Sequence, residues 1–533
     1  MLLSSLPRRY QLAAGLVFLL LFLYTLTQLQ LSSVQTLHFP FGGQAVHHEA
    51  PTSASTQDTV FHSPAAPKLS SSATTAFSVP ESITDSTTTI ATTSASLTTP
   101  SASGTASALP AGHHTAPVEP QWCFERFRLN YLYNLAGSAT KYCTDNSKSN
   151  LSCFHSQTAK DGRIDSFCVG GPSSFDATLK KFKLDCQLRG WAAEGAPYHA
   201  PSFDKFAQYQ YQTGPKYVFD SYVTWSEGLD VAKDVISVPR KLVILVKREN
   251  VVDDLFHTIT QISSLTMTLD VLRMAPLLTS FVFMPDDILN TQIVVVDDYD
   301  EGPYWDLWTV YAGQPIKRLA ALSADELAGG NVIVPLAGGS NPLWQADWEP
   351  IACSSSPLLS TLSTRVLIFY NISTMPLPDH RPLTLTFIDR KEERRLLNQT
   401  ALLSSLEAKY PALNISVVDF ANITFAQQLQ IVHETDILVG VHGADLTHSL
   451  FLPPGSAVVE ILPHSVTRQR FHNLAKMMGH RHFAAHADGQ PREGGAGDWQ
   501  EDDVSISPDP FLSLVDEVVK SMDNRGTQRR HVT

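Results

Sequence analysis

Apolar runs of β-strand length alternate with helix-like segments along the second half of the chain. In order, these elements lie at 383–390, 392–410, 414–420, 425–436, 437–441, 457–462, 471–479 and 481–487. Strands that are apolar over nearly their whole length are typical of a parallel sheet that helices cover on both faces. The pattern therefore predicts an α/β domain with the strands at 383–390, 414–420, 437–441, 457–462 and 481–487.

A similar pattern precedes this domain. Strand-like runs lie at 241–247, 292–298 and 331–337, with a helix-like segment at 253–275 between the first two. The stretch from 122 to 240 is interrupted by cysteines and predicts few regular elements. We therefore expect two α/β domains whose boundary falls between 344 and 365. Their ranges are 121–350 and 351–523, and a tail follows at 524–533.

The N-terminal segment predicts a membrane anchor and a stalk. Residues 11–27 are apolar and follow Arg8 and Arg9, and no further Lys or Arg occurs before Lys68. This asymmetry favours a single-pass helix at 10–31 with a cytoplasmic tail at 1–9. A cleaved signal peptide is the alternative. Residues 51–118 consist mainly of Ser, Thr, Ala and Pro, which predicts a disordered, O-glycosylated stalk over 32–120.

Composition narrows the possible partners and the compartment. The 533-residue chain has a formal net charge of −13, which argues against a nucleic-acid partner held by a broad basic face. Its six cysteines favour disulfides in an oxidising lumen, with 15 possible pairings, and no C-x-x-C pair supports the alternative of a zinc site. Acceptor sequons for N-glycosylation occur at Asn150, Asn371, Asn398, Asn414 and Asn422.

The stretch DILVGVHGADLTHSLFLPPGSAVVEILP at 436–463 carries the clearest candidate chemistry. His442 and Gly443 follow a strand that should end at the ligand-binding edge of the sheet. Gly443 allows close approach of a ligand, and the next helix offers free N–H groups to a phosphate. Glu460, in the following strand, could accept both hydroxyls of a ribose. A purely structural turn is the alternative, as is a metal centre built from His433, Asp436, His442 and His448.

This stretch resembles the signature of glycosyltransferase family 61, and the likeness extends over about 240–490. Supporting segments, in the same order as in the family, are LFHT at 255–258, VVVDDYDEGPYWDLW, FIDRKEERRLLNQ and SVTRQRFHNLAKMMGHRHFAAHA. The resemblance implies a GT-B fold, in which two Rossmann-like domains enclose a cleft. It also implies inverting transfer from a UDP-sugar, held mainly by the C-terminal domain, to a glycan or glycoprotein on the N-terminal side.

The resemblance also implies roles for individual residues. His257 and Asp297 are the candidate catalytic residues, and packing or capping of a helix is the alternative role for His257. The nucleotide-sugar site would comprise Arg390, Arg395, His442, Gly443, Ala444, Thr447 and Glu460. The family implies that neither a metal nor another cofactor is needed. A Golgi type II membrane protein, or one of the endoplasmic reticulum, is the expected location.

Three departures from the family pattern leave activity and donor open. Asp254 replaces an Asn, and Gln261 stands where a carboxylate commonly follows the histidine by four residues. An amide cannot accept the acceptor's proton, so a catalytically inactive sugar-nucleotide or carbohydrate-binding protein is one alternative. Tyr299 replaces a histidine of the plant xylosyltransferases, so xylose is the favoured donor sugar only as a leaning, with N-acetylglucosamine as the alternative. Asp298 and Asp300 suggest a third reading, a metal-dependent GT-A transferase.

Overall fold

The computed structural model describes residues 119–159, 161–190, 200–225, 241–274, 283–323, 330–378, 381–464, 466–489 and 499–529. These residues belong to one compact unit, 107–533. The expected anchor at 10–31 and nearly all of the expected stalk at 32–120 lie outside the described residues. Within the described ranges, no helix has both the length and the apolar character that crossing a membrane requires.

The second half of the chain forms a parallel five-stranded sheet, as the apolar pattern predicts. Its order is β12-β11-β13-β14-β15, and every neighbouring pair is parallel. The strands are β11 (Thr384–Ile388), β12 (Asn414–Val418), β13 (Ile437–Val441), β14 (Ala457–Leu462) and β15 (Arg481–His486). Strands β13 and β14 are buried throughout because helices cover both faces.

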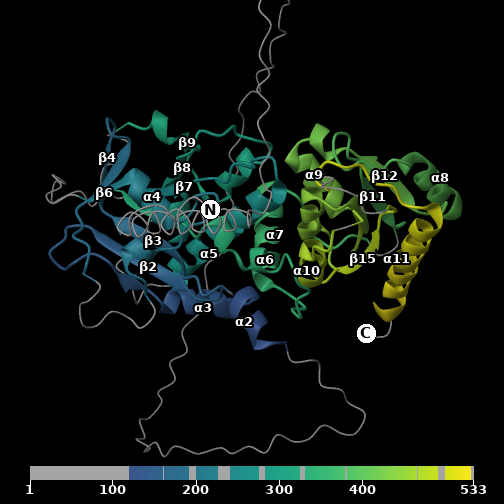
Figure 1. The fold of residues 1–533 in the computed structure, drawn as a ribbon, viewed down its shortest axis with the longest axis horizontal. Helices are drawn as coiled ribbons and strands as arrows, with labels where there is room; N and C mark the ends of the chain where they lie inside the picture. The colour runs from purple at the N-terminus through teal and green to yellow at the C-terminus, as the bar shows by residue number, and fades with distance from the viewer. Residues whose placement is uncertain are drawn as a thin grey trace, which may run out of the picture. The chain divides into compact units, whose positions relative to one another are not determined.

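The helices of this half lie on opposite sides of the sheet (Figure 1). One face packs against α8 (Gln399–Lys409) and α11 (Pro508–Arg529), and the other against α9 (Phe425–His433), the 3-10 helix η8 (Ala444–Phe451) and α10 (Arg470–Met477). Alternate residues of β13 serve the two faces, with Ile437 and Val439 in one core and Leu438 in the other. A further 3-10 turn, η7 (Phe420–Asn422), follows β12.

The first half contains a seven-stranded mixed sheet in the order β1-β2-β3-β10-β7-β8-β9. Only β10, β7, β8 and β9 run parallel, whereas β3, β2 and β1 extend the sheet antiparallel. The strands are β1 (Thr140–Lys141), β2 (Asn150–Ser156), β3 (Asp165–Gly171), β7 (Leu242–Val246), β8 (Thr291–Val295), β9 (Lys317–Arg318) and β10 (Asn331–Val334). The Rossmann-like character of this half is therefore confined to the parallel strands.

The remaining elements of the first half surround this sheet. A small sheet contains β4 (Ser173–Asp176), β5 (Lys181–Leu184) and β6 (Val223–Trp225). The α-helices are α2 (Gln121–Phe127), α3 (Leu129–Gly137), α4 (Pro215–Tyr222), α5 (Leu255–Met274), α6 (Pro342–Gln345) and α7 (Pro357–Phe369). The 3-10 turns are η1 (Phe203–Lys205), η2 (Pro285–Asn290), η3 (Trp305–Tyr311), η4 (Leu319–Ala321) and η6 (Gly338–Ser340). Helix α5 is buried on nearly every side, which explains its lack of a polar face.

All six cysteines form disulfides, as expected for an oxidising compartment. The pairs, which the sequence leaves open, are Cys123–Cys353, Cys143–Cys186 and Cys153–Cys168. The last pair joins directly opposed residues of β2 and β3. The disulfide between Cys123 and Cys353 ties α2 to the segment before α7 across 230 residues of sequence.

The sequons differ in how accessible they are. Asn150, Asn371, Asn414 and Asn422 are exposed. Asn398 is only partly exposed, and its side-chain amide nitrogen donates to the Ile506 carbonyl at 3.0 Å. Glycosylation of Asn398 would require that hydrogen bond to break, so the prediction is stronger at the four exposed sites.

Candidate functional site

The order of the parallel sheet locates a candidate ligand site between β11 and β13. The chain leaves β11 toward β12 on one side, whereas β13, β14 and β15 follow on the other, so the strand order reverses between these two neighbours. Ligands of open α/β sheets bind beyond the carboxyl ends of the strands at such a reversal. Arg390 and Arg394 follow β11, and His442 and Gly443 follow β13.

Two arginines converge on the turn after β13. Arg394 donates from Nη1 to the His442 carbonyl at 2.9 Å, and Arg390 pairs with Asp445. A Cβ atom placed on Gly443 would lie 2.8 Å from Arg390 Nη1 and 3.3 Å from Arg394 Nη1. Burial and then the charge of Arg390 lower the pKa of Arg394 to about 10. Two guanidinium groups with one carboxylate, Asp445, between them thus lie beside Gly443, and this local excess of positive charge suits an anion.

The structure turns Arg395 away from this site. Its guanidinium makes an exposed ion pair with Asp503, with Nη2 2.6 Å from Oδ2, and its backbone N–H donates to the same carboxylate. Arg394, one residue earlier, occupies the place that sequence reasoning gave to Arg395. Two consecutive arginines after a strand offer no signal for choosing between them, because the φ of +53° at Arg394 decides which one faces the turn.

Glu460 is buried and holds two histidines. One carboxylate oxygen pairs with Nδ1 of His442, and the other lies 2.8 Å from Nε2 of His482. Burial favours the neutral acid, but the hydrogen bonds from His442 and His482 outweigh it and lower the pKa of Glu460 below its ordinary value. Each oxygen of Glu460 is thus engaged by one histidine, and the carboxylate orients His442, while its contact with a ribose stays a prediction.

The helix that follows the turn supplies further polar groups. Ala444 is the first residue of η8, so the turn carries the free N–H groups of a helix start, although the helix is 3-10 rather than α. The hydroxyls of Thr447 and Ser449 are buried and have no hydrogen-bond partner among the described residues. His448 is fixed by the Asp445 carbonyl and by Gln428, and burial lowers its pKa to about 4.

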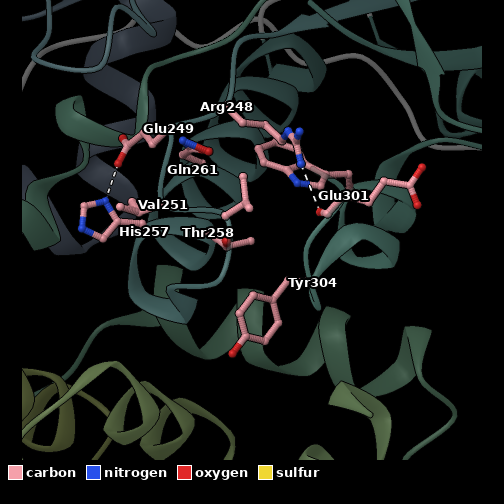
Figure 2. Close-up of a pocket in the computed structure, with 10 residues that line it drawn as sticks. Arg248, Glu249, Val251, His257, Thr258, Gln261, Glu301 and Tyr304 are labelled. Atoms are coloured by element: carbon pink, nitrogen blue, oxygen red, sulfur yellow. Dashed lines mark hydrogen bonds and ion pairs between the residues drawn. The ribbon is translucent and has the colours of Figure 1, made fainter. Parts of the chain in front are cut away.

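A second site lies at the N-terminal end of α5, where His257 meets Glu249. Nδ1 of His257 lies 2.5 Å from Oε2 of Glu249, a residue that follows β7 (Figure 2). Asp254 caps the helix by accepting from the His257 backbone N–H at 3.0 Å. The imidazole also packs edge-on against Trp344 and Tyr211, with ring centroids 4.8 and 5.5 Å apart. Glu249 therefore fixes both the tautomer and the orientation of the ring.

Glu249 has one oxygen to spare. Among the described residues, Oε1 of Glu249 and Nε2 of Gln261 are both buried without a hydrogen-bond partner. A Cβ on Gly338 would lie 2.6 Å from Glu249 Oε1 and equally close to Gln261 Cγ, so the two side chains approach the same point. Burial raises the pKa of Glu249, although His257 partly opposes the increase. Figure 2 shows these side chains around a cavity of about 10 Å³, enough for roughly one water molecule.

Asp297, the other candidate catalytic residue, is fully engaged by Arg248. The guanidinium Nη2 lies 2.8 Å from one carboxylate oxygen, and the Arg248 backbone N–H donates to the other at 2.7 Å. Both side chains are buried. This geometry makes Asp297 a structural partner of Arg248 rather than a proton acceptor.

The residues considered for a metal do not gather. Asp298 and Asp300 are exposed after β8, and His433 is bound through Nδ1 to the Phe451 carbonyl. In the part of the chain that the structure describes, no group of three His, Cys, Asp or Glu side chains is arranged to hold a metal ion.

The two histidine sites adjoin each other. Burial, and then the negative charges of Asp445 and Asp254, raise the pKa of Tyr304. Asp254 also acts on Arg394, and α5 contacts η8. Asp254 belongs to the His257 site and Asp445 to the turn after β13. The candidate proton acceptor and the candidate anion site therefore border one region of the molecule.

A match to a known protein family covers the turn after β13 and the two arginines that approach it. Residues 348–459 match the family model described as Glycosyltransferase 61. The matched segment contains Arg390, Arg394, His442 and Gly443 and ends one residue before Glu460.

Curated relatives carry the name EGF domain-specific O-linked N-acetylglucosamine transferase. The Drosophila melanogaster protein is 29% identical over 183 residues, 32% of this chain and 33% of that protein. The Rattus norvegicus protein is 39% identical over 112 residues, 20% of this chain and 21% of that protein. The matches thus span a third of these relatives or less. A solved structure of a putative D-3-phosphoglycerate dehydrogenase from Ralstonia solanacearum aligns at 10% identity over 54% of this chain and 95% of its own, with a TM-score of only 0.15. The segment at 348–459 is thus similar to glycosyltransferase family 61, and the curated relatives match this chain over part of their length.

Proposed function

We propose that the chain is an inverting glycosyltransferase that moves a sugar from a UDP-sugar to a hydroxyl of a glycan or glycoprotein in the secretory pathway. The observation that carries this proposal is the convergence of Arg390 and Arg394 on Gly443 at the strand-order reversal. The names of the relatives favour N-acetylglucosamine over xylose as the transferred sugar. The proposal includes a GT-B arrangement and a type II membrane location in the Golgi or endoplasmic reticulum.

The donor diphosphate would bind at the turn after β13. Arg390 and Arg394 supply positive charge, and the N–H groups of residues 443–445 supply donors to the phosphate oxygens, whereas the N–H of Leu446 already donates to the Gly443 carbonyl at 3.0 Å. Nδ1 of His442 is held by Glu460, so Nε2 is the atom left for a phosphate, to which it donates when the imidazole carries both protons. These groups stabilise the negative charge that develops as the bond from the sugar to the diphosphate breaks. Thr447 remains a candidate contact through its unpartnered hydroxyl.

The acceptor hydroxyl would be activated by His257. Glu249 accepts the Nδ1 proton, so Nε2 carries the lone pair. As the acceptor oxygen bonds to the anomeric carbon, its proton moves to Nε2, and the bond to UDP breaks with its electron pair leaving on the diphosphate. Attack from the face opposite UDP inverts the configuration. Glu249 stabilises the imidazolium that forms, as the buried carboxylate of a Ser-His-Asp triad does.

Glu249 bears directly on whether Gln261 abolishes activity. The sequence places an amide where the family commonly has an acid, which favours a protein that binds without turnover. In the folded chain, however, Glu249 brings a carboxylate to the side of Gln261 and onto His257. This observation favours an active transferase over an inactive binder. The metal-dependent GT-A alternative has weaker support, since Asp298 and Asp300 are exposed and Asp297 is engaged by Arg248.

The test uses the full-length chain, a panel of UDP-sugars and EDTA, with release of UDP measured with and without glycan or glycoprotein acceptors. We expect one donor, UDP-N-acetylglucosamine, to be consumed with acceptor present and EDTA to have no effect. Binding of UDP without turnover of any donor would support the inactive-binder alternative. Loss of turnover in EDTA would contradict the metal-independent mechanism.

A further inference from the structure

A large cavity opens beside Glu249 on the first half of the molecule. Its volume is about 640 Å³, within the size range of small-ligand sites. Four aromatic residues contribute to its wall, namely Tyr209, Tyr211, Trp344 and Trp348. We refer to it as the aromatic cavity. Glu249 lines both this cavity and the small cavity that contains His257, so the two spaces share one carboxylate.

The aromatic wall is held in place while part of it stays open. Trp348 is 54% exposed, which is unusual for a tryptophan, although the Arg468 guanidinium lies 3.3 Å from its ring centroid. Arg470 lies over Phe256 and near Trp344. Both arginines pair with buried Asp347 at 2.8 Å. Trp348 is therefore kept at the cavity by the guanidinium of Arg468, whereas Trp344 also packs against the hydrophobic core.

The polar groups of the cavity indicate what it would bind. Arg163 is the cation among its described lining residues, and it is already paired with Asp165 at 2.9 Å and Asp161 at 3.2 Å. The carboxylates in the lining are Asp161, Glu249 and Glu349. Among the lining residues that the structure describes, an anionic ligand would meet net negative charge and no cation outside an ion pair. A neutral polyol would find acceptors for its hydroxyls.

The contacts at the inner end connect the cavity to the proposed chemistry. Tyr211 packs edge-on against His257, and burial, followed by the charge of Glu249, raises the pKa of Tyr211 to about 12. Trp344 packs against the same imidazole from another element, α6. A ligand that contacts Tyr211, Trp344 and Glu249 therefore reaches the immediate surroundings of His257.

We propose that the aromatic cavity binds a neutral sugar residue of the acceptor, with the apolar face of the sugar ring against the aromatic wall and a hydroxyl directed toward Glu249 and His257. This inference rests on the proposed glycosyl transfer and deepens it. It assigns a saccharide, rather than an unmodified serine or threonine of a protein, as the acceptor. A pyranose ring has an apolar face of C–H groups and a rim of hydroxyls, which matches an aromatic wall with carboxylates nearby.

The test compares Trp348→Ala, Trp348→Phe and the control Tyr133→Ala, all in the full-length chain. Tyr133 is a suitable control because it is 62% exposed and lies on α3, outside the cavity lining. The probes are the neutral disaccharides chitobiose and N-acetyllactosamine, their sulfated forms, and an unglycosylated peptide that contains serine and threonine. Binding is measured by ligand-observed NMR without donor, and acceptor KM, donor KM and kcat are measured with donor.

Loss of one stacked ring should weaken binding of a neutral disaccharide, and raise its acceptor KM, by about tenfold in Trp348→Ala, since aromatic contacts contribute up to about 1.5 kcal/mol. Trp348→Phe should keep most of the affinity, Tyr133→Ala all of it, and donor KM should not change. Equal binding by wild type and Trp348→Ala, stronger binding of the sulfated probes, or transfer to the peptide that Trp348→Ala leaves intact would overturn the proposal. If wild type neither binds UDP nor turns over a donor, the proposed transfer fails, but Trp348-dependent binding of the disaccharide still decides the cavity's ligand.

Discussion

Two buried glutamate–histidine pairs have the same local geometry and different surroundings. In both pairs a carboxylate binds Nδ1 of an imidazole, Glu249 with His257 and Glu460 with His442. The second oxygen of Glu460 is held by His482, whereas that of Glu249 has no partner among the described residues. Accordingly the pKa of Glu460 is lowered and that of Glu249 is raised.

One pair of residue types, glutamate and histidine, can therefore serve two tasks in this protein. Glu460, with two donors and a lowered pKa, is ionised more readily than an ordinary glutamate, which suits a site that holds a histidine toward a phosphate. Glu249, held by a single histidine and with its other oxygen beside Gln261, has a raised pKa and is less firmly ionised, which suits a site through which a proton passes. The number of hydrogen-bond donors around the carboxylate, more than its burial, separates the two.

Among the effects on ligand binding, we expect the largest at the proposed diphosphate site, where it is measured as a loss of UDP affinity. Arg394→Ala should weaken UDP binding by about tenfold to a hundredfold, because a hydrogen bond to a charged group contributes about 1.5–3 kcal/mol. Arg395→Ala removes an exposed pair with Asp503 and should change UDP affinity less than twofold. Isothermal titration of UDP into both variants measures the difference. Equal losses would contradict the assignment of Arg394 to the turn.

Moving the carboxylate from position 249 to position 261 tests whether Glu249 supports the catalytic base. Glu249→Gln should reduce kcat, and adding Gln261→Glu in the same chain should recover about tenfold of the loss, as general-base effects on this scale are typical of a restored carboxylate. The recovery is expected because both side chains approach the same point beside Gly338. Gln261→Glu alone is the control and should not raise kcat, since two adjacent carboxylates disfavour ionisation. A folded double variant no more active than Glu249→Gln would contradict this role.

The smallest effect concerns the pH dependence of stability. The lowered pKa of Glu460 stabilises the fold above the ordinary glutamate pKa of about 4.3, and this contribution is lost as the pH falls through the lowered value. The raised pKa of Glu249 acts in the opposite sense, and its contribution is lost as the pH rises through the raised value. Glu460→Gln should therefore lower the free energy of unfolding by roughly 1–3 kcal/mol at pH 7 and by less at pH 4.

Glu249→Gln should show the opposite trend, with a smaller loss at pH 7 than at pH 4. Urea unfolding of both variants at the two pH values measures these differences. A loss for Glu460→Gln that is equal at pH 7 and pH 4 would show that the carboxylate's charge is not what holds this pair.

The parallel sheet was predictable from the sequence because β11, β13 and β14 are buried on both faces, so their residues are mostly apolar and the alternation of a half-exposed strand is missing. The antiparallel strands β1, β2 and β3 of the other sheet were not predictable in this way. Strands β2 and β3 contain buried polar residues such as His155 and Ser166, whose side chains hydrogen-bond to each other. A disulfide also joins the two strands. Neither feature leaves a simple periodic signal.

The candidate site was also predictable only in part. The turn at His442 and Gly443 has a local pattern of strand, glycine and helix, and the structure places it at the expected edge of the sheet. The partners of its side chains depend on distant segments. Glu249 follows β7 and meets Gln261 of α5 only after folding, and Glu460 meets His482 across β14 and β15. In the sequence, Glu249 stands out only as one of the charged residues that end the apolar run at 241–247, and this position does not predict which side chains it contacts.

The most direct test of this account measures kcat and the dissociation constant of UDP for Glu249→Gln and Glu460→Gln side by side in the full-length chain. The account predicts that Glu249→Gln lowers kcat by about 10²–10⁴-fold with UDP affinity unchanged, since a misoriented base costs roughly that much. Glu460→Gln should chiefly weaken UDP binding. Loss of UDP affinity in both variants, or a wild-type kcat in Glu249→Gln, would contradict the division of work between the two pairs.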